Sequence, residues 1–141
     1  MDKIWAERKF IDTWSINHFL FGATLPLILQ KIGFEFWSSF LIAVILFIFW
    51  EAIEKFTHES ESGYNGIFDI ILATAGFVSF WQVHNKISLL LVIVVFSILE
   101  TFGYGRRVFK SLNKKSRMLG LLWIFAVLVY LIFYIFALRS L

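Results

Sequence analysis

Long apolar stretches alternate with short polar segments along the chain. Five stretches are long enough to predict membrane-spanning helices, at residues 14–30, 34–53, 67–83, 87–102 and 118–138. A helix that rises 1.5 Å per residue needs about 17–25 residues to cross the hydrocarbon core of a bilayer. The pattern therefore predicts an all-α, polytopic transmembrane helix bundle of five spans, in one integral membrane domain over residues 1–141. A four-span bundle with one short helix folded back is the alternative.

The composition agrees with lipid as the solvent. The 141 residues are 60% hydrophobic and 20% aromatic, with a mean hydropathy of +0.80, whereas soluble domains are about 45–50% apolar. The chain has no cysteine, which excludes disulfide frameworks, thiolate metal sites and cysteine nucleophiles. Its first residues lack the apolar core and cleavage site of a secretory signal. We expect an integral protein of the plasma membrane, with the first span acting as its membrane-targeting signal.

The distribution of Lys and Arg predicts how the bundle is oriented, because cytoplasmic loops carry the excess of these residues. With the N-terminus inside, the outer segments hold three of the 13 basic residues, Lys31, Lys86 and Arg139. The inner segments hold the other ten, Lys3, Arg8, Lys9, Lys55, Arg106, Arg107, Lys110, Lys114, Lys115 and Arg117. The predicted topology is N-in/C-out.

Residues 1–13 have their own pattern. One face of a short helix can hold Ile4, Trp5, Phe10, Ile11 and the adjoining Trp14, with the basic residues elsewhere. That arrangement is typical of an interfacial amphipathic helix lying on the bilayer. A frayed tail is the alternative.

Polar residues gather at the inner ends of the first four predicted spans. They are Asn17 and His18 in the first, Glu51 and Glu54 in the second, Asn65 and Asp69 in the third, and Glu100 and Thr101 in the fourth. Asp69 ranks first as a functional candidate, because a carboxylate near hydrocarbon needs a partner, a cation or a proton. Ala73, Ala75 and Gly76 follow within two turns and predict that a neighbouring helix approaches closely there.

The acidic residues Glu51, Glu54 and Asp69 suggest a metal site, supported by Asn65 and Glu100. Oxygen clusters suit Mg²⁺ or Ca²⁺, and a contribution from His18 or His58 would shift the preference toward transition metals. If the site is catalytic, Asp69 or His18 is the candidate general base. Structural hydrogen bonding or pairing with arginine is the alternative for the three acids. Solvation is the alternative for the loop residues Glu59 and Glu61.

The segment between the last two predicted spans, residues 103–117, carries six basic residues. Such clusters attract anionic headgroups and phosphates, so Arg106 and Arg107 are candidate phosphate-binding residues. The ordinary bias of cytoplasmic loops explains the same charges. No nucleic-acid recognition motif accompanies them.

Three short motifs resemble the VanZ-like family of small polytopic membrane proteins. They are the His18-Phe19 pair, Glu51-x-x-Glu54, and Asp69-x-x-x-Ala73-x-x-Gly76, over about residues 14–77. The chain departs from the family pattern in having Glu54 in place of Gln and Ala73 in place of Asn, and in lacking an Arg before Asp69. The resemblance implies an envelope-related membrane role and does not imply a particular reaction.

Two functions are compatible with these features. The first is a cytoplasmic-leaflet site that recognises a phosphate-bearing lipid or headgroup through a divalent cation. The second is a non-enzymatic membrane anchor or sensor that docks a cytoplasmic partner or oligomerises through its helices. An ion transporter is disfavoured because the titratable groups cluster on one side, and whether the protein is an enzyme stays open.

Overall fold

The structure is a computed structural model that describes residues 13–57, 63–83, 85–110 and 114–139. For residues 13, 54–57, 63, 104, 106–110, 114–120 and 122–123 it describes the backbone alone. The described chain forms α1 (Thr13–Ile32), α2 (Phe36–Thr57), α3 (Gly63–Phe80), α4 (Lys86–Lys110) and α5 (Lys114–Arg139). No strand occurs in these ranges. The prediction of an all-α chain with five helices is confirmed for the described residues. The interfacial helix predicted for residues 1–13 lies outside the described residues apart from Thr13.

Several helices are longer than the apolar stretches that predicted them. α3 begins at Gly63 and not at residue 67, and α4 continues to Lys110 and not to residue 102. The predicted loop over residues 103–117 is wrong, since only residues 111–113 separate α4 from α5. The apolar stretch predicts only the part of a helix that is suited to lipid. The backbone hydrogen bonds of the helix can continue beyond it through polar residues. Gly103 and Gly105 are tolerated inside the helix at a cost of about 1 kcal/mol each relative to alanine.

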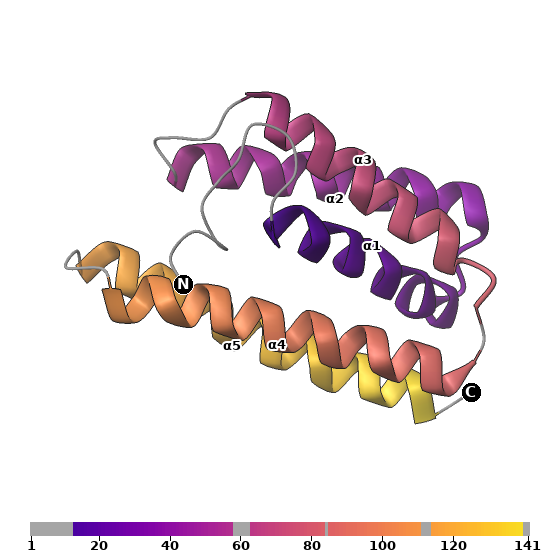
Figure 1. Cartoon of the computed structure of the whole chain (residues 1–141). Helices are drawn as coiled ribbons and strands as arrows, with labels where there is room; N and C mark the ends of the chain where they lie inside the picture. Colours follow the sequence, from indigo (N-terminus) through magenta and orange to yellow (C-terminus); the bar gives the residue numbers. More distant parts are fainter. Residues whose placement is uncertain (1–12, 58–62, 84, 111–113, 140–141) are drawn as a thin grey trace. The chain divides into compact units, whose positions relative to one another are not determined.

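The chain divides into two compact units, residues 1–84 with α1 to α3 and residues 85–141 with α4 and α5. In the first unit α1 and α3 run in the same direction and α2 runs opposite to them (Figure 1). The start of α1, the end of α2 and the start of α3 therefore lie at one end of this unit. The second unit is an antiparallel helical hairpin (Figure 1).

Small residues let α1 and α3 pack with their backbones in contact. A Cβ atom added at Gly22 would overlap the carbonyl group of Ala73, and one added at Gly76 would overlap the carbonyl of Phe19. Ala73 is completely buried, whereas Ala75 is exposed. The predicted close approach is confirmed at Ala73 and Gly76, with α1 as the approaching helix. Contacts of this small-residue type hold membrane helices together where no hydrophobic force acts between them.

Aromatic rings join α2 to α3 at the other end of the unit. Phe36 lies with its ring centroid 5.2 Å from that of Trp81, and Phe40 lies 6.1 Å from Phe77. The chain enters α2 through a tight turn at Gly33, whose φ of 96° is left-handed. Two hydrogen bonds cap the C-terminal end of α1, as in a Schellman motif. They run from the Gly33 amide to the Gln30 carbonyl and from the Phe34 amide to the Leu29 carbonyl.

The hairpin of α4 and α5 packs along a seam of regularly spaced buried residues. On α4 these are Leu89, Ile93, Phe96 and Glu100, with alternating intervals of four and three residues as in coiled coils. On α5, the buried Tyr134 donates a hydrogen bond from its hydroxyl to the Leu89 carbonyl at 3.2 Å. The carboxylate of Glu100 is thus part of the buried face of the second unit.

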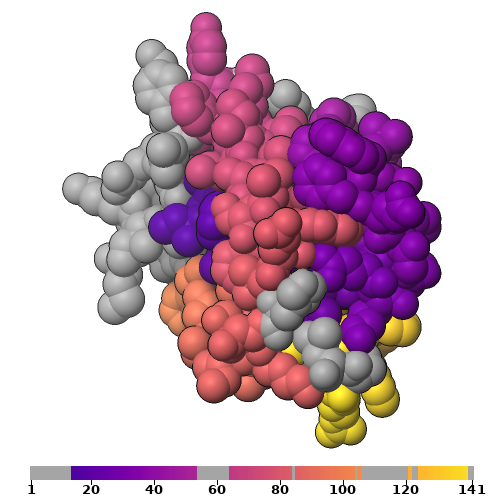
Figure 2. Space-filling view, turned by 90° about the vertical axis from the view of Figure 1, so that its right-hand side faces the viewer, coloured from indigo at the N-terminus to yellow at the C-terminus, as the bar shows by residue number. Residues whose placement is uncertain are grey.

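Two helices in the described ranges are long and apolar enough to span a membrane, α2 over Phe36–Ile53 and α4 over Lys86–Gly103. Only 22% and 33% of these two segments is buried. The bulky side chains of α2 stand at the surface in Figure 2, and they include Trp37, Leu41, Ile45, Ile48 and Phe49. Apolar helices are thus present, while the full set of five spans is not confirmed.

Candidate metal centre

Three helices each bring one potential metal ligand to the same end of the first unit. His18, Glu51 and Asp69 lie five or six residues from the ends of α1, α2 and α3, which is about 8–9 Å of helix at 1.5 Å per residue. Asp69 was expected two residues into its helix, and it lies deeper because α3 begins earlier. All three residues are therefore about one and a half turns from the ends of their helices.

The face of α2 that carries Glu51 is fixed by the spacing of its buried residues. Ser39, Ala43, Phe47 and Glu51 recur every four residues and are all buried, so they share one side of the helix. The aromatic ring of Phe47 contacts that of Phe21 on α1, with centroids 6.0 Å apart. This packing, one turn before Glu51, turns the carboxylate toward α1.

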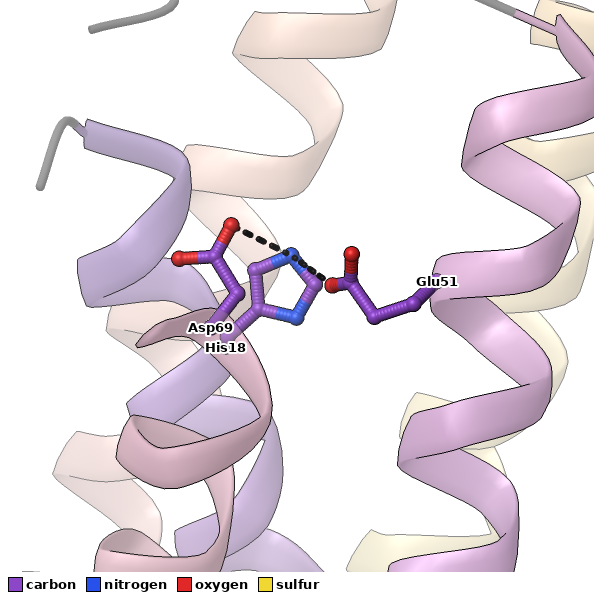
Figure 3. Close-up of side chains that lie close together, drawn as sticks. All are labelled: His18, Glu51 and Asp69. Atoms are coloured by element: carbon purple, nitrogen blue, oxygen red, sulfur yellow. Dashed lines mark ion pairs between the residues drawn. The ribbon is translucent and has the colours of Figure 1, made fainter. Parts of the chain in front are cut away.

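The imidazole of His18 lies between the two carboxylates (Figure 3). Its Nε2 atom is 3.7 Å from Glu51 Oε1 and 3.8 Å from Asp69 Oδ2. Both distances exceed the roughly 2.7–3.2 Å of an N–H···O hydrogen bond. One nitrogen and two oxygens, one from each residue, lie within 4.8 Å of one another. The three residues form a group that could hold a metal ion.

Asn65 fixes the carboxylate of Asp69 from the preceding turn of α3. Its Nδ2 amide donates a hydrogen bond of 2.9 Å to Asp69 Oδ2, the same oxygen that faces His18. In the described part of the chain the Oδ1 atom of Asn65 is buried and accepts no hydrogen bond. The Asn65 amide group thus positions the candidate ligand Asp69 through Nδ2, while its Oδ1 atom can accept a hydrogen bond from another group.

The carboxylates of the cluster are buried, so their negative charge must be compensated. His18 is 7% exposed, Glu51 is 4% exposed and Asp69 is 1% exposed. Ionised carboxylates in such surroundings require strong compensation. A protonated imidazole between them leaves these three groups with a net charge of −1. A metal ion is one source of positive charge that would compensate the two carboxylates.

The remaining predicted site residues either lie outside the described side chains or belong to the second unit. Glu54 is on the last turns of α2 and Arg106 and Arg107 are on the last turns of α4, but their side chains lie outside the described residues. His58, Glu59 and Glu61 lie outside them entirely. Glu100 belongs to the hairpin unit described above. In the described chain, the only group of three potential metal ligands is His18, Glu51 and Asp69.

The close approach predicted at Ala73 is made by Gly22 of α1, a residue that the sequence did not single out as its partner. Gly22 follows His18 by four residues and Ala73 follows Asp69 by four. A tight contact between the two helices therefore lies one turn from the cluster. The signal in the sequence was a small residue at the same interval after each polar residue.

The chain was compared with protein-family models, with curated proteins and with solved structures, and no match was found in any of the three. The resemblance of its motifs to the VanZ-like family stays a prediction.

Proposed function

We propose that the protein is a five-span membrane protein whose His18–Glu51–Asp69 cluster recognises a phosphate-bearing lipid headgroup through a divalent cation, in an envelope-related role. The observation that carries the proposal is the convergence of one imidazole and two carboxylates, from three helices, in a buried position. A metal held by these groups would bridge to a phosphate oxygen. The membrane site would be in the plasma membrane.

The placement in a bilayer is supported by the surfaces of the helices. The exposed side chains of α2 and α4 are large and apolar over most of their length, whereas the core helix of a soluble protein is mostly buried. Hydroxyl groups within the helices donate to their own backbone, as Thr74 does to the Ile70 carbonyl at 2.8 Å and Ser97 to the Ile93 carbonyl at 2.7 Å. Such internal bonds satisfy polar groups where no water is present.

The distribution of Lys and Arg supports a cytoplasmic position of the cluster. Ten of these residues lie in the predicted inner segments and three in the outer ones. With the N-terminus inside, the start of α1, the end of α2 and the start of α3 all face the cytoplasm, and so does the cluster. Under the same topology the end of α4 faces inward. Arg106 and Arg107 there would contact lipid phosphate directly.

The topology has a simple test because the chain contains no cysteine. Single-cysteine variants Ser111→Cys and Ser140→Cys are treated with a membrane-impermeant maleimide in intact cells and in inverted vesicles. We expect Ser111→Cys to react in the vesicles and Ser140→Cys to react in the cells. The opposite pattern, or labelling of both from one side, would refute the five-span N-in assignment.

The function is tested with phosphatidic acid and with diacylglycerol of the same acyl chains, which lacks the phosphate. Native mass spectrometry of the protein in nanodiscs measures lipid retained with and without EDTA. We expect phosphatidic acid to be retained preferentially and released by EDTA. Asp69→Asn should reduce retention at least about tenfold, because it removes a charged ligand.

Glu35→Gln is the matched control for this experiment, since Glu35 is an exposed carboxylate at the other end of the unit. It should bind lipid as the unmodified protein does. If Asp69→Asn folds and retains phosphatidic acid unchanged, the proposed lipid site is wrong. A stoichiometric protein partner that co-purifies with both variants would instead favour the second function, a membrane anchor that docks a cytoplasmic protein or oligomerises.

A further inference from the structure

The donor atoms of the cluster distinguish between classes of divalent cation. Mg²⁺ and Ca²⁺ take oxygen ligands almost exclusively, whereas imidazole nitrogen suits zinc, iron, copper and nickel. His18 Nε2 lies 3.7 Å from a Glu51 oxygen and 3.8 Å from an Asp69 oxygen. A cation held by all three residues would therefore have one nitrogen ligand beside its carboxylate oxygens.

The dimensions and burial of the cluster point in the same direction. Ligands about 2.0–2.2 Å from a tetrahedral zinc ion are roughly 3.3–3.5 Å apart, so the His18–Glu51 and His18–Asp69 pairs need to close by only a few tenths of an ångström. Mg²⁺ sheds water reluctantly and usually keeps several water ligands. A cluster whose three residues are 1–7% exposed is unsuited to such a hydrated ion.

The ligand count leaves room for one more group. In the described chain three residues supply three ligand atoms, and zinc sites with three protein ligands keep a fourth position for water or substrate. Asn65 Oδ1 is a buried acceptor without a hydrogen bond among the described residues. It belongs to the side chain whose Nδ2 bonds Asp69 Oδ2, so a metal-bound water is a fitting donor to it.

We propose that the cation is a first-row transition ion of the zinc type, bound by His18, Glu51 and Asp69, with one exchangeable position that is occupied by water. The inference rests on the proposed function and names the metal class at that site. The water position is where a phosphate oxygen enters. Asn65 is a positioning residue that orients Asp69 and accepts a hydrogen bond from the water.

Metal selectivity tests the proposal. The full-length protein in detergent is stripped with a chelator, then titrated with Zn²⁺, Co²⁺ or Mg²⁺ while bound metal per chain is measured. We expect one Zn²⁺ or Co²⁺ per chain, held against millimolar Mg²⁺. His18→Asn keeps an oxygen donor but removes the nitrogen, so it should weaken Zn²⁺ binding at least about 100-fold, and Asn65→Ala should weaken it by about 10–100-fold. Glu35→Gln should bind as the unmodified protein does.

The exchangeable position is read from the visible spectrum of the Co²⁺ form. Four-coordinate Co²⁺ absorbs strongly and six-coordinate Co²⁺ weakly, and a ligand that replaces water shifts the bands. We expect strong bands that change when inorganic phosphate is added. A spectrum that phosphate leaves unchanged would overturn the open position.

The outcomes separate this inference from the proposed function. If Mg²⁺ binds the cluster and displaces Zn²⁺ at similar concentration, the transition-metal assignment is wrong while cation-dependent lipid retention can still hold. If Zn²⁺ binds as expected but phosphatidic acid is retained equally by the unmodified protein and by Asp69→Asn, the metal assignment stands and the lipid function fails. Absence of any metal bound at one per chain refutes the inference directly.

Discussion

Replacing Gly22 with alanine tests whether the contact between α1 and α3 holds the candidate metal centre together. The added Cβ atom would overlap the backbone carbonyl of Ala73, which cannot move aside as a flexible side chain can. Gly22 and Ala73 each lie one helical turn from a member of the cluster, His18 and Asp69 respectively. The substitution therefore acts on the spacing of two ligands without removing either of them.

The size of the effect follows from the overlap. Non-bonded heavy atoms pack at about 3.5–4.0 Å, so the two helices must separate locally by about 1 Å or more. Overpacking of this kind costs about 1–3 kcal/mol of stability. Metal–ligand distances tolerate deviations of about 0.2 Å, so a separation of this size at His18 and Asp69 should weaken metal binding at least about tenfold.

The measurements are thermal unfolding of the purified protein in detergent and Zn²⁺ titration. Gly105→Ala is the matched control, because a Cβ atom at that helical glycine meets nothing within 4 Å among the residues that the structure describes. Alanine there should leave metal binding unchanged and stabilise the protein by up to about 1 kcal/mol. If Gly22→Ala unfolds and binds metal as the unmodified protein does, the packing argument is refuted.

Two further substitutions test the parts of the fold that surround this contact. Tyr134→Phe removes the hydroxyl that bonds the Leu89 carbonyl and should destabilise the α4–α5 hairpin by about 0.5–1.5 kcal/mol, measured by chemical denaturation; an unchanged midpoint would mean that the bond contributes nothing. Gly33→Ala places a side chain at a φ of 96° and should cost about 1–2 kcal/mol without altering metal binding. A change in metal affinity would contradict the expectation that the Gly33 turn, at the other end of the unit, does not affect the His18–Glu51–Asp69 cluster.

The number and type of the helices followed from the sequence because each apolar stretch is bounded by polar residues or glycine. The ends of the helices did not follow in the same way. The segment from Gly103 to Lys110 was predicted to be a loop on account of its glycines and charges, yet it continues α4. The apolar content of a segment predicts whether it prefers lipid or water. It does not predict where the helix ends, because backbone hydrogen bonds form equally well in polar segments.

The candidate site was predictable as a set of residues but not as an arrangement. His18, Glu51 and Asp69 were singled out because each puts a polar group inside an apolar helix. Their mutual distances depend on how three helices pack, and the pattern on a single helix contains no such information. The direction in which Glu51 points depends on the buried stripe that it shares with Ala43 and Phe47. The sequence shows these positions only as part of a uniformly apolar helix.

The burial of Asp69 in α3 also bears on how the protein enters a membrane. An aspartate at the centre of a span disfavours insertion of an isolated helix by about 2.5–3.5 kcal/mol, and Asp69, six residues from the start of α3, should cost part of that. The described apolar part of α3 is also shorter than that of α2. On the proposed topology, α2 can insert by itself, whereas α3 needs α1 already beside it to shelter its carboxylate. The small residues that bring α1 and α3 together would then set the order of assembly during biogenesis, and an insertion assay on α3 alone, with and without Asp69→Leu, would reveal that dependence.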